Sequence, residues 1–318
     1  MRKNILFFLL AFTASGICFA QQDALFTQYM FNKLALNPGY VGSREALSGD
    51  ILYRSQWVGI DGAPKTFSAS IHSPLPNEHV AVGLTAYNDK LGPVSTTGVL
   101  ATGAYRVIFP DSKLSFGLQA GFYNSNIDRS MLNPSDQSDP ALDLSSANNK
   151  MVPDVNVGVY YYSEKYFVGF SSKHLLQNQT IVVRNAAENK NEFSKLFAHF
   201  YIMGGAVFPV ADGVLFRPST FVKFVKNSPP QMDLNVSFLL KEKLWLGTSY
   251  RAAFGKDKFQ QNALCFLVDF NVLNNLRIGY SYDISLNELK TTNKGSHEIR
   301  LGFDINVIGT EINRLRCF

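Results

Sequence analysis

Polar and apolar side chains alternate along much of this chain, and the clearest run lies near its C-terminal end. There the two kinds of residue interleave: Ile299, Leu301, Phe303, Ile305 and Val307 are apolar, whereas Glu298, Arg300, Asp304 and Asn306 are polar. Successive side chains of a β-strand point to opposite faces of a sheet. This run is therefore predicted to be a strand with one apolar and one polar face.

Similar runs recur along the chain and predict about fourteen antiparallel strands, a number within the range of outer-membrane barrels. The predicted strands are 50–58, 64–74, 79–88, 94–108, 113–126, 153–163, 165–172, 195–208, 213–224, 231–240, 243–253, 260–271, 275–284 and 297–307. The run at 195–208 alternates less regularly. Pro218 lies within 213–224 and cannot donate a ladder hydrogen bond, so a bulge or local break is expected there.

The connections between these strands alternate in length. Short ones lie around 74–77, 110–112, 163–165, 209–212, 241–243 and 272–275, and longer ones at 127–152, 172–194, 226–231, 254–259 and 284–296. Up-and-down barrels of the outer membrane have short periplasmic turns and longer external loops. The pattern predicts such a transmembrane barrel, and the even strand number predicts that both chain ends lie in the periplasm.

A soluble all-β protein would also alternate. Small barrels fill their interior with apolar side chains, but about fourteen strands enclose too wide a space for that. The polar face is therefore expected to line a wet lumen and the apolar face to contact outer-membrane lipid. A pair of soluble β-sandwiches remains the alternative fold.

Aromatic residues near the predicted strand ends are expected to form girdles at the two membrane interfaces. They are Tyr53, Trp57, Tyr87, Tyr105, Phe109, Phe122, Tyr161, Tyr166, Trp245, Tyr250 and Tyr280. Aromatic residues are also common in strands generally, so this pattern only supports the membrane interpretation.

Composition fits an ordered, exported protein. Hydrophobic residues make up 46% of the 318 residues and charged residues 17%, which excludes a disordered chain. Residues 1–20 are typical of a signal peptide for Sec-type export, with a predicted cut between Ala20 and Gln21. The bulky Ile17 argues against lipid attachment at Cys18. Without the signal, 28 basic and 25 acidic residues leave a net charge of +3, too mild to indicate a nucleic-acid partner.

Residues 21–49 precede the first predicted strand and are expected to form a periplasmic or lumen segment. Phe26, Tyr29, Met30 and Leu34 recur at helical spacing, and a turn signal follows at 37–40. The predicted division is thus 1–20 signal peptide, 21–49 N-terminal segment, 50–307 barrel and 308–318 C-terminal tail.

No catalytic motif, metal-ligand spacing or cofactor-binding loop is found in the sequence. The histidines of the mature chain stand apart: His72, His79, His174, His199 and His297. Asp136, Asp139 and Asp143 share the longest loop but match no calcium-binding spacing. Cys265 and Cys317 are expected to be unpaired. These observations indicate a non-enzymatic protein without a metal or cofactor.

Charges of both signs lie on the predicted polar face: Arg54, Arg217, Lys223, Asp233, Arg251, Asp269, Arg277, Asp283, Arg300 and Asp304. A strongly selective pore favours one sign of charge. Structural pairing of these charges inside the lumen is therefore preferred over a selective pore.

Several short stretches resemble the PorP/SprF family, over essentially the whole mature chain. They include Gln28-Tyr29, the stretch 37–42 (NPGYVG), the stretch 53–59 (YRSQWVG) with 62–64 (GAP), 217–219 (RPS) and the ending 314–318 (RLRCF). The matching positions, whose roles are unknown, are Gln28, Tyr29, Asn37, Pro38, Tyr40, Gly42, Tyr53, Arg54, Gln56, Trp57, Gly59 and Pro64. Gly39, where relatives often carry alanine, and Leu315, where proline is frequent, are mild departures.

This resemblance implies an outer-membrane barrel of the type IX secretion system of Bacteroidetes. The expected role is non-enzymatic export or surface display of partner proteins, such as gliding adhesins. The implied partners are a secreted surface protein with a C-terminal sorting domain and periplasmic components of the secretion system. A passive channel or small-molecule transporter is the alternative function.

Overall fold

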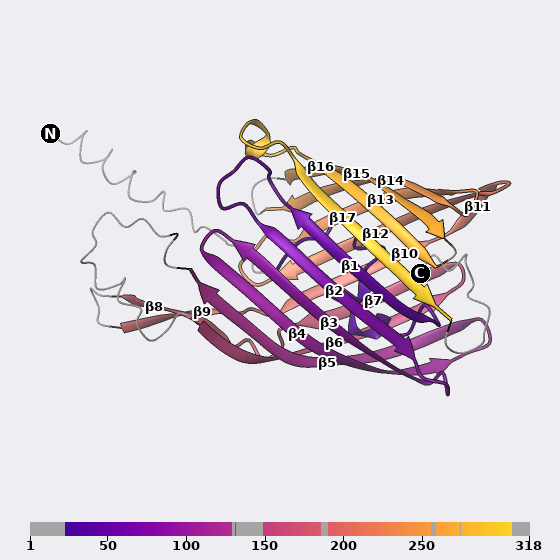
Figure 1. Cartoon of the computed structure of the whole chain (residues 1–318), viewed down its shortest axis with the longest axis horizontal. Coiled ribbons are helices and arrows are strands. Elements are labelled where there is room, and N and C mark those ends of the chain that lie inside the picture. Colours follow the sequence, from indigo (N-terminus) through magenta and orange to yellow (C-terminus); the bar gives the residue numbers. More distant parts are fainter. Residues whose placement is uncertain are drawn as a thin grey trace.

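The computed structural model describes residues 23–128, 131, 149–185, 190–255, 259–273 and 275–306. Strands dominate the described chain (Figure 1). They are β1 (Leu47–Ser55), β2 (Lys65–Pro74), β3 (Val80–Leu91), β4 (Val94–Ile108), β5 (Ser112–Ile127), β6 (Asn149–Ser163), β7 (Tyr166–Lys173), β8 (Gln179–Asn185), β9 (Lys190–Lys195), β10 (His199–Ala206), β11 (Phe208–Ala211), β12 (Val214–Val225), β13 (Gln231–Leu240), β14 (Leu244–Phe254), β15 (Phe259–Leu273), β16 (Leu276–Ser285) and β17 (Ser296–Ile305). Three short 3₁₀ helices complete the described elements: η1 (Lys33–Ala35), η2 (Pro38–Tyr40) and η5 (Glu288–Thr291).

Fourteen of these strands close into one antiparallel barrel. Each barrel strand pairs with its neighbour in the chain, and β1 pairs with β17 to close the ring. The closure leaves β11 as one extra strand that pairs only with β12, and β8 with β9 forms a separate two-stranded sheet. The predicted fold class, an up-and-down barrel of about fourteen strands, is confirmed.

Alternation in the sequence becomes alternation between the outside and the lumen. Along β13 the side chains of Asp233 and Asn235 are buried in the lumen, whereas Leu234 and Val236 are exposed on the outer face. The same outward apolar band continues around the barrel, as the period of two requires. In the part of the chain that the structure describes, no helix is long and apolar enough to span a membrane.

The predicted strand positions agree with the structure except around the eighth strand. The region predicted as one strand, 195–208, instead contains the end of β9, the strand β10 and the start of β11. The connection before it, predicted as a loop, carries the hairpin of β8 and β9. That hairpin extends beyond one end of the barrel (Figure 1).

The expected irregularity at Pro218 lies in the neighbouring strand. The pairing of β12 with β13 runs without a register shift past Pro218. On the other side of β12, pairing with β10 ends at Ser219 and pairing with β11 begins at Phe216. The backbone N–H of Val207, between β10 and β11, donates instead to the carbonyl of Lys165 (2.7 Å). The missing N–H of Pro218 therefore lies where the facing strand is interrupted.

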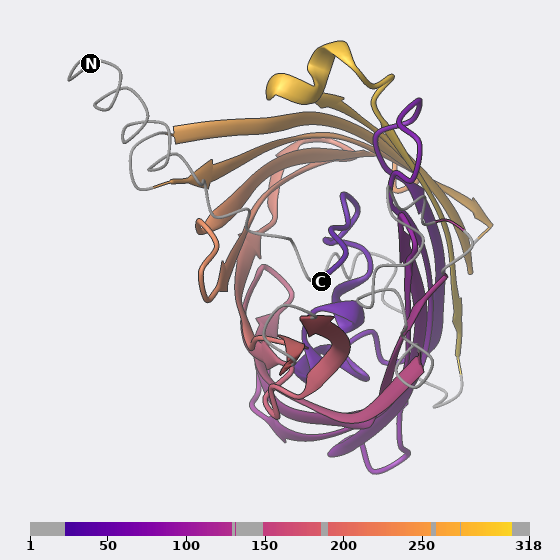
Figure 2. The same ribbon diagram turned by 90° about the vertical axis from the view of Figure 1, so that its left-hand side faces the viewer.

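The residues before β1 lie inside the barrel. Figure 2 shows this segment, in indigo, within the ring of strands. We call residues 23–46 the lumen segment. It consists of turns with the two short 3₁₀ helices η1 and η2, and the helical spacing of Phe26, Tyr29, Met30 and Leu34 does not correspond to an α-helix. The strand β1 begins at Leu47, three residues earlier than predicted.

The lumen segment crosses the barrel from one end to the other. Asp23 contacts Lys173, at the end of β7 where the longer connections lie. Leu47 pairs with Ile305 at the opposite end, where the connections are short. The sequence left a periplasmic or a lumen position open for this segment, and its described residues lie in the lumen, with Asp23 near the long-connection end.

Some predicted girdle residues face inward. Tyr53, Tyr105, Phe122 and Tyr166 are exposed on the outer face, as expected. Trp245, however, is buried in the lumen, because its strand β14 starts at Leu244 and places it on the inward face.

Several predicted features lie outside the described residues. They are the signal peptide with its cut at Ala20–Gln21, Cys18, the loop carboxylates Asp136, Asp139 and Asp143, Cys317, and the tail at 308–318. Among described cysteines, Cys265 is free and buried.

Candidate functional site

The candidate functional site is the interface between the lumen segment and the inner wall of the barrel. Buried apolar residues of the segment include Tyr29, Met30, Leu34 and Tyr40, each at most 2% exposed. The wall residues packed against them are apolar and include Tyr160, Phe221 and Trp245, whereas many other inward strand positions are polar or charged. Buried polar groups are costly unless they are hydrogen-bonded or paired. The polar groups of the segment therefore need hydrogen-bond or ion-pair partners on the wall.

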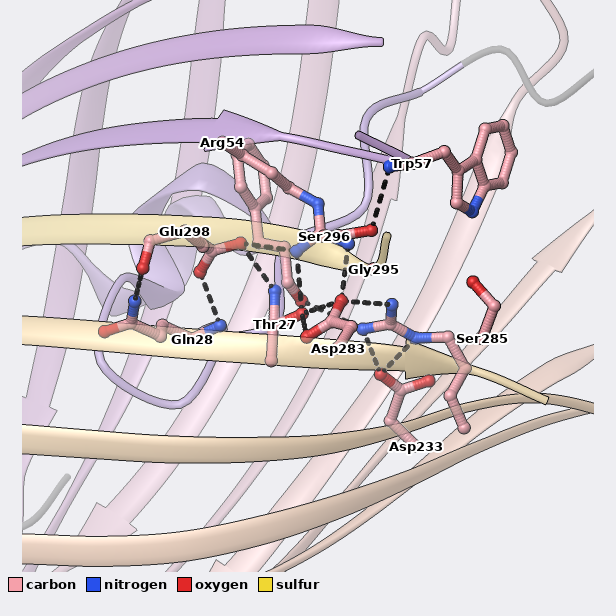
Figure 3. Close-up of polar contacts among 12 residues, drawn as sticks. Thr27, Gln28, Arg54, Trp57, Asp233, Asp283, Ser285, Gly295, Ser296 and Glu298 are labelled. Atoms are coloured by element: carbon pink, nitrogen blue, oxygen red, sulfur yellow. Dashed lines mark hydrogen bonds and ion pairs between the residues drawn. The ribbon is translucent and has the colours of Figure 1, made fainter. Parts of the chain in front are cut away.

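Backbone N–H groups of the lumen segment bind a carboxylate of the wall. Those of Thr27 and Gln28 donate to the two carboxylate oxygens of Glu298 on β17, at 2.9 and 2.7 Å (Figure 3). The Thr27 hydroxyl donates to Asp283 on β16 (2.7 Å). These bonds provide acceptors for two backbone N–H groups that are buried inside the barrel.

Arg54 on β1 connects the same groups. Its guanidinium donates to the Thr27 hydroxyl oxygen (2.8 Å) and pairs with Asp283 (2.7 Å) and Glu298 (3.1 Å) (Figure 3). All three charged side chains are at most 4% exposed. Arg251 extends the network by pairing with Asp233 (2.7 Å). Removing one partner of such a buried network leaves an uncompensated charge.

A second group of paired charges lies nearer the short-connection end. Arg300 pairs with Asp269 (2.7 Å) and with Asp50 on β1. Arg44 of the lumen segment pairs with Asp304 (2.7 Å), which also pairs with Arg277 (2.7 Å). Thus the structure pairs these charges of the polar face, as the mixed signs indicated.

The turn at Asn37 is seated on strand glycines. The Asn37 side-chain oxygen accepts from the Gly39 N–H (2.8 Å), and its amide donates to the carbonyl of Val159 (3.0 Å). A Cβ atom on Gly158 of β6 or on Gly117 of β5 would collide with Asn37 or with the Pro38–Gly39 backbone. Only glycine fits at these two strand positions, because atoms of the lumen segment lie directly against the strand backbone.

Tyr40 and Gly42 fix the segment to the wall near the short-connection end. The ring of Tyr40 packs edge-on against His72 and Tyr160, with centroids 5.5 and 5.4 Å away. The Gly42 N–H donates to His72 Nδ1 (3.1 Å), and Arg106 donates to the Gly42 carbonyl (2.8 Å). Gly42 has φ +74°, a conformation that favours glycine.

Aromatic rings and cations pack together between these anchors. The guanidinium of Arg217 lies 3.9 Å from the Trp245 ring centroid and 4.7 Å from that of Phe31. The ammonium of Lys33 lies 4.4 Å from the centroid of Phe167. Cation–π contacts of this kind stabilise desolvated cations by about 2 kcal/mol or more.

At the long-connection end the lumen segment starts in a cluster of histidines and carboxylates. His174 lies between two carboxylates, with Nε2 2.9 Å from Asp23 and Nδ1 3.0 Å from Asp154. Asp23 also accepts from Lys173 (2.9 Å). Although burial opposes the charged form, Asp23 and Asp154 raise the pKa of His174 above its usual value. Burial would raise the pKa of Asp23, but Lys173 and His174 hold it well below its usual value.

The structure brings together seven of the residues predicted from the family resemblance. Gln28, Tyr29, Asn37, Pro38, Tyr40 and Gly42 lie in the lumen segment, and Arg54 lies on the wall that holds it. Tyr53, next to Arg54, faces outward. The predicted set is therefore divided, because neighbouring residues of a strand point to opposite faces.

The remaining predicted residues form the connection between β1 and β2. The Gln56 N–H donates to the Pro64 carbonyl (2.9 Å) and closes this loop. The Trp57 N–H donates to Ser296 (3.1 Å; Figure 3). Gly59, in the same loop, has φ +99°. These residues shape the loop that follows Arg54 in the chain. Among the described residues, no hydrogen bond joins this loop to the turn at Asn37.

The sequence did not identify Thr27, the strand glycines or the cluster at Asp23 as site residues. The sequence identified the inward charged residues of β16 and β17, but it did not identify the residues with which they pair. The arrangement is suited to holding a polypeptide inside a barrel.

Comparison with known proteins identifies a family and a fold. The family model described as type IX secretion system membrane protein PorP/SprF matches residues 18–303. A search of proteins with curated functions gives no match. Three solved structures are similar to the chain. The first is a TodX deltaS2S3 mutant monoaromatic hydrocarbon channel, 9% identical, with 86% of this chain and 94% of that chain covered and a TM-score of 0.51. The second is the Ralstonia pickettii toluene transporter TbuX, 9% identical, with 87% and 93% of the two chains covered and a TM-score of 0.50. The third is the CymD monoaromatic hydrocarbon channel, 11% identical, with 91% and 96% covered and a TM-score of 0.50. At these identities the similarity shows the fold alone.

Proposed function

The chain belongs to the PorP/SprF family of type IX secretion system membrane proteins, and from this premise we propose that it is a non-enzymatic outer-membrane barrel that binds partner proteins and helps to export or display them. The observation that carries the proposal is the lumen segment, a folded stretch of polypeptide held inside the barrel by Arg54, Asp283 and Glu298. A barrel filled in this way is suited to protein contacts more than to free diffusion of solutes.

The orientation follows the general rule for such barrels. Short turns face the periplasm and longer connections face outward. The last described residue, Asn306, then lies near the periplasmic end, and Asp23 lies near the external mouth of the lumen. We propose that the C-terminal tail stays in the periplasm, whereas the N-terminal end of the mature chain enters the lumen.

The external partner surface proposed here includes the hairpin of β8 and β9. Within the described residues these two strands pair only with each other, so neither outer edge carries a further strand. An extended segment of a partner can add to such an edge through main-chain hydrogen bonds. A secreted surface protein with a C-terminal sorting domain is the proposed partner.

The periplasmic partner surface proposed here lies at the other end. A recess of about 750 Å³ lies beside the turns that connect β4 to β5 and β6 to β7. Lys113 in this recess pairs with Glu45 of the lumen segment and with Glu78 (3.2 Å). A periplasmic component bound here would contact the lumen segment directly, which allows it to influence the segment's position.

Deletion of residues 23–46, with the signal peptide retained, tests the proposal. We expect the deleted chain to reach the membrane and to keep the heat-dependent gel mobility of a folded barrel. Export of the surface partner should be lost, as scored by surface labelling in a strain that lacks the native copy. Normal export by the deleted barrel would contradict the proposal.

A passive channel is the second candidate, since the similar solved structures are described as hydrocarbon channels and a transporter. The buried rings of Tyr29, Phe31 and Tyr40 in the lumen argue against an open pore. Conductance of the purified barrel in a planar bilayer distinguishes the two. A steady open current from the intact chain would favour the channel.

A further inference from the structure

Asp23, His174 and His199 lie far apart in the sequence, yet their ligand atoms come within 4.8 Å of one another. His174 and His199 are fully buried, and the Asp23 side chain is only 9% exposed. The two imidazole rings meet edge to face with centroids 5.5 Å apart. We propose that these three residues form a binding site for one divalent transition-metal ion, with zinc as the ion that the ligand set fits best.

The first support is a buried nitrogen that lacks a hydrogen bond. Nδ1 of His199 lies 2.9 Å from the carbonyl of Phe197, which fixes it as the protonated nitrogen. Nε2 is then a lone-pair atom, and no described residue donates a hydrogen bond to it. A buried acceptor without a partner costs roughly 1–3 kcal/mol. A metal ion bound to this atom would remove that cost.

The second support is that every proposed ligand is oriented by a further contact. His174 is held through Nδ1 by Asp154 (3.0 Å), the carboxylate–histidine arrangement common in metal sites. The second oxygen of Asp23 accepts from Lys173 (2.9 Å) and from the Tyr201 hydroxyl (3.0 Å). The first oxygen of Asp23 and Nε2 of His174 therefore face each other, 2.9 Å apart.

The ligand set defines the class of metal. Two imidazole nitrogens and one carboxylate oxygen are a set that zinc sites use with a fourth position filled by water. Zinc–ligand bonds of about 2.0–2.1 Å require ligand atoms roughly 3.3 Å apart in a tetrahedron, a separation between the 2.9 Å of the Asp23–His174 pair and the 4.8 Å limit within which all three ligand atoms lie. A cavity of about 30 Å³ borders Asp23 and Lys173 and has room for a water molecule.

Charge at the site is compatible with a dication. Asp23 and Asp154 supply two negative charges, and the cation that faces Asp23 directly is Lys173. Metal binding would replace the proton between His174 Nε2 and Asp23, so one positive charge leaves as the ion enters. The two carboxylates then balance the ion, and the Lys173 ammonium leaves one positive charge beside the site.

The location gives the site a structural consequence. Asp23 belongs to the lumen segment, His174 follows β7, and His199 begins β10. A bound ion would tie the first described residue of the segment to the barrel wall at the long-connection end. This inference does not depend on a role in secretion, because metal binding is measured on the isolated barrel.

The test uses the full-length barrel, purified in detergent without a histidine tag and stripped with a chelator. Zinc titration by calorimetry should show one ion bound per chain, and cobalt should give the intense visible absorption of tetrahedral coordination. His199→Phe, which keeps a ring but removes both nitrogens, should weaken zinc binding at least tenfold. His297→Phe is the matched control and should bind like the wild type, because His297 contacts Tyr280 far from this cluster.

Asp154→Asn tests whether the Asp154 carboxylate orients His174 for metal binding. Loss of such a supporting carboxylate typically weakens metal binding 10–100-fold, so a decrease in that range is expected. Heat-dependent gel mobility reports whether each variant folds. If His199→Phe does not fold, the wild-type stoichiometry and the cobalt spectrum decide the question. Absence of stoichiometric zinc binding by the wild type, or equal binding by a folded His199→Phe variant, would overturn the proposal.

Discussion

The side chain of Asn37 occupies the space where a Cβ atom of Gly158 would lie. One residue belongs to the lumen segment and the other to the middle of β6, 121 positions later in the chain. The contact shows that the wall was shaped for the segment that it encloses. It therefore offers a way to displace the segment without changing the outer face of the barrel.

Gly158→Ala is expected to loosen the lumen segment. The added methyl group must push the Asn37 side chain away, at a cost of about 1–3 kcal/mol for overpacking. Limited proteolysis should then cut within residues 23–46, while heat-dependent mobility shows an intact barrel. Gly103→Ala is the matched control, because a Cβ at Gly103 meets no atom within 4 Å. Equal protection of both variants would show that the seat at Gly158 is not required.

Arg54→Gln is expected to be among the most destabilising changes on the inner wall. It leaves Asp283 and Glu298 partly uncompensated in a buried site, which typically costs about 3–5 kcal/mol. The measurement is the urea midpoint of unfolding in detergent. Lys241→Gln, at an exposed turn, is the control and should leave the midpoint unchanged. A midpoint shift no larger for Arg54→Gln than for the control would refute the role given to Arg54.

Alternation of residues was sufficient to predict the barrel because strand burial has a period of two and is a local property. It placed Arg54 and Asp283 inward correctly. It did not show what fills the lumen, since the bond from Thr27 to Glu298 joins residues 271 positions apart. The apolar spacing of Phe26 to Leu34 is helical, but this stretch forms turns and a 3₁₀ helix, and the N–H groups of Thr27 and Gln28 donate to the Glu298 carboxylate of the wall.

The site at Asp23 was missed for the same reason. His174 and His199 lie 25 residues apart, and no metal-ligand spacing connects them. They meet because β7 and β10 are neighbours in the barrel, and their partner Asp23 arrives only by crossing the lumen. Sequence spacing can identify ligands on one helix or loop, but it cannot identify ligands that three separate segments bring together.

Trp245 provides a spectroscopic test of the inward face. With Trp57 replaced by Phe, Trp245 is the remaining tryptophan, since the chain has two. Its ring packs beside Arg217 inside the barrel, so brominated lipids should not quench its fluorescence and acrylamide should quench it weakly. A residue of the lipid-facing girdle would be quenched strongly by brominated lipid. That result would support the prediction from the sequence that Trp245 belongs to an interfacial girdle.

Locking the lumen segment to the wall tests whether it must move during export. The Asn32 side-chain oxygen lies 3.4 Å from the Ser70 hydroxyl on β2, so these two positions are chosen for a cysteine pair, and thiol titration verifies that the disulfide has formed before export is scored. The background carries Cys265→Ser and Cys317→Ser to remove the native thiols of the mature chain. In the oxidised double variant we expect surface display of the partner protein to fall to the level of the deletion strain, and to recover after reduction. The single variant Ser70→Cys should export normally under both conditions. Because the locked segment keeps its folded position, a loss of export cannot be attributed to an unfolded barrel. Undiminished export by the fully oxidised double variant would instead show that the segment is a fixed part of the wall, and that partners are handled at the barrel ends alone.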